Sequence, residues 1–279
     1  MAKRRKETRV RMLVLRALFL AVFCVAAVML GRALLADRQE QSTFKELAAI
    51  KAQSAANMPQ PSEEAISSPE QSGQETAPLE TPKPSPLPQY AELCKMNRDF
   101  FGWLTIEDID VDFPVMYAPD RREYYLNRDF YGEYSHVGTP FIDENCPPDG
   151  NFYLIYGHHI EDIRVKSMFG KLFRYDDPAY WEQHPTFRFD TAYEEREYEV
   201  MAVFYSRIYY VEEKDVFRYY EYTDLCDEAV FNDYVRQVKE AERYDTGVTA
   251  SYGDELIALS TCSYHDVNGR FVVVARRIK

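Results

Sequence analysis

The sequence predicts a mostly β fold: a small closed or nearly closed β-barrel with one helix inserted late in the chain. Aromatic residues make up 15% of the 279 residues, and only Phe19, Phe23 and Phe44 precede Tyr90. The packed core must therefore lie after Tyr90. That part of the chain contains roughly seven or eight short β-type apolar runs, with no regular alternation of strands and helices. This pattern favours a barrel over an α/β sheet.

The N-terminus has the pattern of a membrane anchor. Residues 1–12 are a basic tail, and residues 13–35 are apolar except for Arg16 and Arg32. A membrane span needs about 20 apolar residues, and arginines near its ends can extend their side chains to the membrane surface. We therefore expect 13–35 to be a transmembrane signal-anchor helix with a cytoplasmic N-terminus. The alternative is a cleaved signal peptide, for which residues 33–36 provide a weak cleavage site.

Residues 36–89 are expected to connect this anchor to the folded domain. Their first part has Phe44, Leu47 and Ile50 at helical spacing, which predicts a short juxtamembrane helix. Residues 57–89 hold eight of the fifteen prolines, mostly among Ser, Glu, Gln and Ala. A segment of this composition cannot bury enough apolar surface to fold, so we expect a disordered stalk.

The folded domain is predicted to span residues 90–279. Residues 109–115 alternate apolar and polar side chains, the period of a strand, and other short apolar runs are read in the same way. The expected elements are a helix at 90–101, strands at 103–106, 109–115, 138–143, 151–156, 186–190, 197–210 and 255–261, a helix or irregular crossover at 160–180, and a late helix at 225–241.

The late helix has the clearest helical signal in the domain. Asp224 is a suitable N-cap for it. Ala229, Val230, Tyr234 and Val238 then fall on one stripe of the predicted helix. The segment is therefore expected to form an amphipathic helix.

The last two dozen residues, 256–279, hold the strongest candidate for chemistry. Two apolar runs flank a polar turn that contains Asn268-Gly269, which is a strong hairpin signal. Cys262 ends the first run and Arg270 begins the second, so a hairpin brings the thiol and the guanidinium to the same end. A cation in this position favours a thiolate and can stabilise an oxyanion. The alternative for Cys262 is a small buried residue at the end of a core strand.

A cysteine nucleophile also needs a group that gives or takes a proton. A Gly-His-His step ends the apolar run at 151–156. If that strand continues, His158 and His159 point to opposite faces, and one of them can face Cys262. His265 is a rival for this role, although its position in the turn fits an exposed residue better.

Composition argues against nucleic acid binding and against a cysteine framework. Residues 1–36 carry eight basic residues and one acidic residue, so the rest of the chain has a formal charge of −20 within the total of −13. So acidic a domain is a poor partner for phosphate groups. The five cysteines show no C-x-x-C pairing, which indicates neither a zinc site nor a disulfide framework. A bridge among Cys94, Cys146 and Cys226 is left open.

The metal-binding patterns in the chain are weak, and no cofactor or metal is expected. Three alternate aspartates within 108–112 have EF-hand spacing, but Phe113 stands where that loop requires glycine. They fit the solvated face of a strand better. The histidines and acids within 158–162 are an alternative set of ligands, but adjacent residues rarely reach one ion.

Taken together, these motifs resemble the sortases, the cysteine transpeptidases of Gram-positive cell surfaces. The order His158, Cys262, Arg270 matches theirs, whereas papain-like proteases have cysteine before histidine. The segments FGWLTI, YYLNRDF, GTPFID and YGHH…SMFGKL resemble class B sortases in particular, as does a helix before the LSTC strand. The resemblance covers about residues 90–279. It implies a closed eight-stranded sortase barrel with an N-terminal helix and one late inserted helix.

The resemblance also implies roles for individual residues. Cys262 matches the nucleophile, His158 the general acid/base, and Arg270 the residue that stabilises the oxyanion or positions the substrate. Residues that match positions in or beside the sorting-signal groove are Leu126, Ser260 and Thr261. Two departures are Ala258, where the family usually has the threonine of TLSTC, and Arg122, where class B members often have asparagine. Because of Arg122, the resemblance does not specify which sorting motif the protein cleaves.

The implied function is that of a membrane-anchored transpeptidase. It would cleave a C-terminal sorting signal after threonine through a Cys262 thioester, and transfer the protein to a peptidoglycan amine of the lipid II type. Its partners would be surface proteins with sorting signals, this precursor, and the membrane through residues 13–35. The catalytic domain would lie outside the cell. The alternatives are a cysteine peptidase that uses water as acceptor, and an inactive surface-binding module on a sortase fold.

Overall fold

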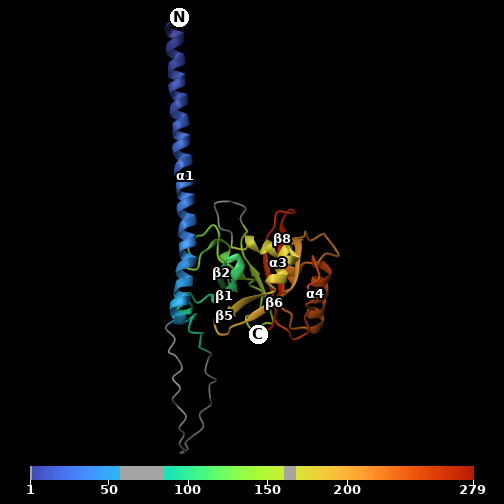
Figure 1. The fold of residues 1–279 in the computed structure, drawn as a ribbon. Coiled ribbons are helices and arrows are strands. Elements are labelled where there is room, and N and C mark those ends of the chain that lie inside the picture. Colours follow the sequence, from blue (N-terminus) through green and yellow to red (C-terminus); the bar gives the residue numbers. More distant parts are fainter. Residues whose placement is uncertain (1, 57–84, 160–167) are drawn as a thin grey trace, which may run out of the picture.

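The structure is a computed structural model that describes residues 2–56, 85–159 and 168–279, without the side chains of many residues before position 42. Within this part, eight strands form a barrel and one long helix runs beside it (Figure 1). The strands are β1 (Phe100–Ile106), β2 (Val111–Met116), β3 (Phe141–Ile142), β4 (Phe152–Tyr156), β5 (Thr186–Thr191), β6 (Glu197–Arg207), β7 (Leu256–Cys262) and β8 (Gly269–Arg277). The α-helices are α1 (Ala2–Ala56), α2 (Ala91–Met96), α3 (Pro178–Gln183) and α4 (Glu228–Ala241).

The strands close into a barrel. Their order is β1-β2-β3-β4-β7-β8-β6-β5, and β5 pairs with β1 to complete the circle. The pairs β2–β3 and β4–β7 are parallel, and the other pairs are antiparallel. The prediction of a mostly β, closed eight-stranded barrel is confirmed.

Strands β7 and β8 form the most deeply buried wall of the barrel. Each residue of β7 before Cys262 is buried, and so are the five central residues of β8. A strand that is buried on both faces reads as a continuous apolar run, which explains why these two segments show no alternation in the sequence. Helix α4 packs against the neighbouring strand β6.

Helix α4 begins three residues later than predicted. Asp227, not Asp224, is its N-cap, and its side chain accepts hydrogen bonds from the backbone N–H groups of Ala229 and Val230. The stripe is shifted as well. Val230 is exposed, and the buried residues of the helix are Phe231, Tyr234, Val235 and Val238. These four follow the i, i+3, i+4, i+7 spacing of a helix face that packs on a core.

Other predicted elements are also shorter in the structure. The helix expected at 90–101 ends at Met96, because Asn97 adopts an extended backbone and β1 starts at Phe100. The strand expected from 109 starts at Val111, after a 3₁₀ turn and a left-handed Asp110 with φ of 50°. Strand β6 likewise ends at Arg207 rather than at 210.

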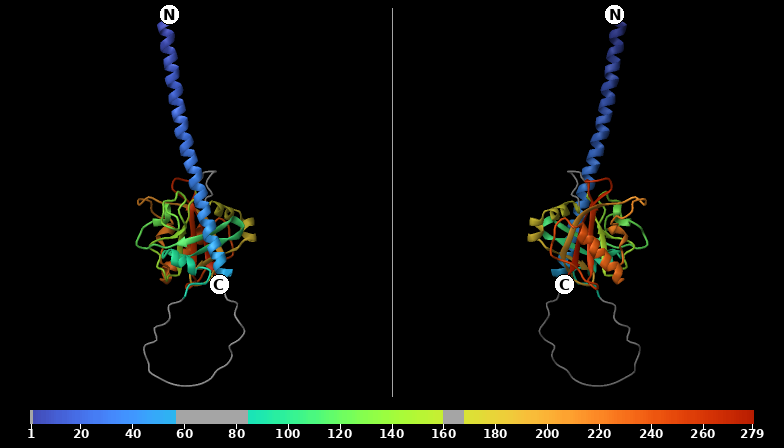
Figure 2. Two further views of the ribbon diagram at one scale, coloured as in Figure 1. Left: turned by 90° about the vertical axis from the view of Figure 1, so that its left-hand side faces the viewer. Right: turned by 90° about the vertical axis from the view of Figure 1, so that its right-hand side faces the viewer.

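Helix α1 is a single helix whose C-terminal turns pack on the barrel (Figure 2). Phe44, Leu47 and Ile50, which their spacing placed on one helical face, make this contact. Leu47 is fully buried, and the Phe44 ring meets the Phe113 ring edge-on at 5.0 Å. Lys51 adds an ion pair, with its Nζ 2.9 Å from Asp112 Oδ1. The last turns of α1 are therefore part of the packed structure.

The predicted membrane span is not confirmed. A search of the described residues finds no helix with a stretch long and apolar enough to cross a membrane. Most of the predicted stalk, residues 57–84, lies outside the described residues. The division of the chain at positions 12, 35 and 89 therefore stays a prediction.

The docking of α1 predicts a loss of stability in Leu47→Ala. Truncating a fully buried leucine costs about 2–5 kcal/mol in the free energy of unfolding, whereas Lys45→Ala, at an exposed position on the same helix, should change it by less than about 0.5 kcal/mol. Denaturant unfolding of the full chain, followed by tryptophan fluorescence, measures both. Equal stability of the two variants would contradict the docking.

Candidate active site

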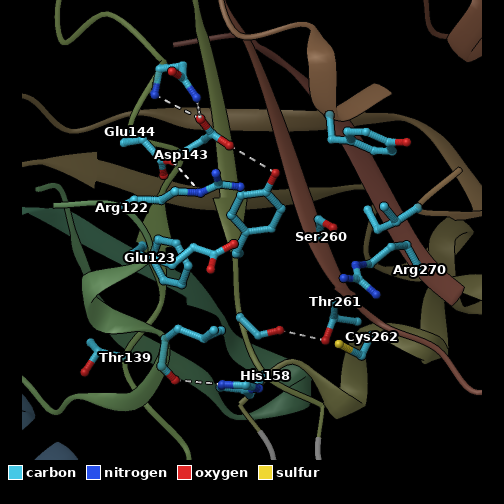
Figure 3. Close-up of a pocket in the computed structure, with 17 residues that line it drawn as sticks. Arg122, Glu123, Thr139, Asp143, Glu144, His158, Ser260, Thr261, Cys262 and Arg270 are labelled. Carbon is cyan, nitrogen blue, oxygen red and sulfur yellow. Dashed lines mark hydrogen bonds and ion pairs between the residues drawn. The ribbon is translucent and has the colours of Figure 1, made fainter. Parts of the chain in front are cut away.

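The parallel pairing of β4 with β7 creates the site. Tyr156 lies opposite Ser260, and the N–H of Gly157 donates to the carbonyl of Ser260 at 3.1 Å. Parallel strands run in the same direction, so residues at matching positions near the ends of the two strands lie side by side. His158 and Cys262 occupy such positions, two residues beyond Tyr156 and Ser260 (Figure 3). The glycine is required here, because a Cβ at position 157 would lie 2.5 Å from the ring of Phe169.

The hairpin of β7 and β8 adds the guanidinium, as predicted. Cys262 and Arg270 are direct partners in the antiparallel register. Asn268 takes the left-handed conformation, with φ of 57°. Gly269 is buried, and a Cβ there would lie 2.3 Å from the carbonyl oxygen of Ser263, which explains the Asn-Gly step. The Arg270 side chain donates to the carbonyl of Gly269 at 2.9 Å.

His158 is held by the backbone of the predicted groove residue Leu126. Its Nε2 lies 2.7 Å from the Leu126 carbonyl oxygen, so Nε2 carries a proton and donates it. Burial lowers the pKa of His158 from its ordinary value; the bond to Leu126 opposes this shift, and the nearby His136 and Arg270 add to it. The neutral imidazole is therefore favoured at neutral pH in the unliganded protein.

The hydroxyl groups of Ser260 and Thr261 are engaged inside the protein. Thr261 Oγ1 donates to the carbonyl of Gly157 at 2.7 Å, which joins the end of β7 to the residue just before His158. Ser260 Oγ lies 2.7 Å from the hydroxyl of the buried Tyr219. Both residues line the groove, and these two bonds fix the orientation of their side chains.

A groove of about 650 Å³ runs across this end of the barrel and contains all six predicted site residues. Its walls come from the segment before β3, from the ends of β3, β4 and β7, from the start of β8, and from the connection between β6 and β7. The lining residues are Arg122, Glu123, Leu126, Thr139, Phe141, Asp143, Glu144, Asn145, Tyr156, Gly157, His158, Ile208, Tyr220, Ser260, Thr261, Cys262 and Arg270.

The acidic wall of this groove was not predicted from the sequence. Asp143 is buried and accepts hydrogen bonds from Asn145 and from the hydroxyl of Tyr156. Glu144 pairs with Arg122 at 3.4 Å. A signal was present: Asp143 directly follows the buried strand β3, in the same way that Cys262 ends β7. A polar residue directly after a buried strand is therefore a signal for a groove position, for the carboxylate as for the cysteine.

The structure also tests the other histidines and cysteines considered in the sequence. His159 Nδ1 lies 3.0 Å from the carbonyl oxygen of Cys262. His265 is an exposed turn residue, as expected. The predicted alternative of a metal site includes residues 161 and 162, which lie outside the described residues. In the part that the structure describes, Cys94, Cys146 and Cys226 are free thiols, so the bridge that the sequence left open does not form.

Comparisons with known proteins give the family. No protein-family model matches the chain. Sortase B of Listeria monocytogenes is 32% identical over 194 residues, which cover 67% of this chain and 73% of that protein. The chain belongs to the class B sortases. Sortase B of Staphylococcus aureus is 28% identical over 196 residues, which cover 69% of this chain and 75% of that protein.

A solved structure supports the fold of this class B sortase. The Staphylococcus aureus sortase B–substrate complex superposes with a TM-score of 0.67 and 22% identity, over 88% of this chain and 99% of that chain. Family membership makes the protein a cysteine transpeptidase enzyme. The barrel, the late helix α4 and the cysteine at the end of β7 agree with this assignment.

The environment of His158 predicts its titration. Its imidazole should titrate below about 6.5, the ordinary value, because burial disfavours the charged ring. A pKa that is depressed in the folded state means that His158 contributes stability above about pH 6.5, which is lost as the pH falls through the folded pKa. NMR titration of the ring C–H signals, assigned with His158→Gln, measures this pKa. A midpoint above the ordinary value would contradict the assignment of burial as the dominant effect.

Proposed function

We propose that this sortase is a membrane-anchored transpeptidase that cleaves a C-terminal sorting signal after threonine and joins the protein to a peptidoglycan amine. The observation that carries the proposal is the register of two strand pairs. One pair, β4–β7, brings His158 beside Cys262, and the other, β7–β8, brings Arg270 opposite Cys262. All three side chains line one groove of about 650 Å³. A peptide lying in this groove would have its carbonyl group between His158, the proposed acid, and the guanidinium of Arg270.

In the first half-reaction, the Cys262 thiol gives its proton to His158, and the sulfur attacks the threonine carbonyl. A C–S bond forms, and the oxyanion of the tetrahedral intermediate is stabilised by the Arg270 guanidinium. The C–N bond then breaks. The His158 imidazolium returns the proton to the departing amine, which leaves a thioester on Cys262. The hydrogen bond from His158 Nε2 to Leu126 orients the ring for this role.

In the second half-reaction, an amine replaces the departed peptide. Its nitrogen attacks the thioester carbonyl, and His158 takes the proton from that nitrogen. The C–S bond then breaks, and His158 returns the proton to the Cys262 sulfur. The products are a new amide and the free Cys262 thiol. A peptidoglycan precursor of the lipid II type supplies such an amine at the outer face of a membrane. Leu126, Ser260 and Thr261 are proposed to contact the sorting peptide along the groove.

The proposed location follows from the basic tail and the apolar residues 13–35. We propose that they anchor the chain with its N-terminus in the cytoplasm and its barrel outside. The direction of α1 is consistent with this arrangement. Its N-terminal part runs past the end of the barrel that carries the turn between β7 and β8, which is red in Figures 1 and 2. The groove would then face the side on which both membrane-bound substrates are found.

A peptide panel tests the function. We expect the full chain to cleave NPxT-type or PxTG-type fluorogenic peptides after threonine, and to form an amide when an amine is added. Cys262→Ala should lose at least about a thousandfold in kcat/KM. Cys226→Ala, which removes an exposed thiol outside the groove, should keep full activity. Cleavage by Cys262→Ala would exclude Cys262 as the nucleophile, and cleavage without amide formation would favour water as the acceptor.

The role of Arg270 makes a separate prediction. Arg270→Ala should lower kcat/KM by about 10²–10³, the usual effect of losing one group that stabilises an oxyanion. Arg270→Lys should lose less than the alanine variant, because it keeps the charge but not the planar fork. Arg276→Ala is the matched control, since Arg276 lies on the same strand and pairs with Glu199 at 3.1 Å. Equal activity of the alanine and lysine variants would contradict a role for the charge.

A further inference from the structure

We propose that His159 is a positioning residue for the reaction. Its imidazole holds the backbone of Cys262 in the position from which the thiol can attack the substrate carbonyl. The proposal rests on the proposed function, in which Cys262 is the nucleophile. The contact that carries it joins His159 Nδ1 to the Cys262 carbonyl oxygen at 3.0 Å. A carbonyl oxygen only accepts, so Nδ1 carries the proton and donates it.

The hydrogen bond replaces a missing rung of the β4–β7 ladder. In a parallel pair, donors along one strand recur every two residues. The N–H of Gly157 donates to Ser260, so the next rung would join the N–H of His159 to the carbonyl of Cys262. Strand β4, however, ends at Tyr156. The side chain of His159 supplies the donor for this rung, and the hydroxyl of Thr261 bonds to Gly157 one step earlier.

The imidazole is itself fixed from two sides. The Phe173 ring lies 4.9 Å from it and stacks on Phe271 of β8 at 4.7 Å. The Tyr264 ring, from the turn between β7 and β8, lies 5.3 Å away, and the Tyr264 hydroxyl donates to the His159 carbonyl at 3.2 Å. These two ring contacts therefore limit the movement of the donor.

The consequence concerns the geometry of attack rather than proton transfer. Cys262 is the last residue of β7, and on its β4 side the His159 imidazole donates to its carbonyl oxygen. Without that bond, the Cα–Cβ vector of Cys262 gains freedom relative to His158 and Arg270. Displacements near 1 Å can cost up to about a hundredfold in rate. We expect about a tenfold loss of kcat with little change in KM, because the peptide-binding walls stay in place.

Two variants of the full chain separate the hydrogen bond from the ring. His159→Phe keeps an aromatic ring between Phe173 and Tyr264 but has no donor. His159→Asn loses the ring but places an amide nitrogen where Nδ1 lies. We expect kcat to fall about tenfold in His159→Phe and to return to within about threefold of wild type in His159→Asn. The rate of Cys262 alkylation by iodoacetamide should follow the same order. Thermal unfolding of each variant shows whether a loss of folding contributes.

The outcomes are distinct. Equal losses in the two variants, or an Asn variant worse than the Phe variant, would show that only the ring matters and would overturn the proposal. Wild-type kcat in both variants would overturn it as well. If the wild type cleaves no sorting peptide, the proposed function fails, and the alkylation series alone decides on His159: a rate restored by Asn and not by Phe supports the positioning role, and any other order rejects it.

Discussion

The site depends on the parallel pairing of β4 with β7. The two strands are about a hundred residues apart in sequence, yet they pair from Phe152 opposite Leu256 to Tyr156 opposite Ser260. Closing so long a loop costs little more than closing a short one, about 0.6 kcal/mol for each doubling of length. Each buried leucine or isoleucine side chain returns about 1.5–3 kcal/mol. Leu154, Ile155 and Leu259 are all fully buried, so burial outweighs loop closure at this pair.

The same pairing explains how polar chemistry is built at the end of an apolar barrel. Within the pair, backbone N–H and C=O groups bond to one another. At the end of the pair, side chains provide the hydrogen bonds to the backbone carbonyls. Thr261 bonds to Gly157, His159 to Cys262, and His158 to Leu126. These bonds link the ends of β4 and β7 to the segment that carries Leu126, and they orient the His158 ring. Preorganisation of this kind lowers the reorganisation needed in the transition state.

The sequence was sufficient where one local signal determined the geometry. Asn268-Gly269 predicted the hairpin between two apolar runs, and pairing of those runs places Arg270 opposite Cys262. The connection spans residues 263–268, so the two buried strands rather than a two-residue turn set the register. The helix cap was less well determined. Asp224 and Asp227 are both good N-caps by type, and only packing of Phe231 and Val235 on the barrel selects the second. Local pattern cannot decide between caps that differ by less than one turn of helix.

Other features depend on contacts between distant segments, which a local signal indicates only in part. The acidic wall arises because β3 lies between β2 and β4, which brings Asp143 to the groove. The docking of α1 depends on the packing of Leu47 on the barrel, and it pairs Lys51 with Asp112, an aspartate that the sequence placed on a solvated face. Adjacent histidines also look equivalent in sequence. The structure distinguishes them by their acceptors, the carbonyl of Leu126 for His158 and that of Cys262 for His159.

The central claim is that Cys262 forms the covalent bond to the substrate, and mass spectrometry tests it most directly. The full chain would be mixed with a cleavable sorting peptide, quenched in acid within one turnover, and digested for peptide mapping. The account predicts a mass increase equal to the acyl fragment, located on Cys262, and its release by hydroxylamine as expected of a thioester. An adduct on another residue, or cleavage without any adduct on Cys262, would contradict the account.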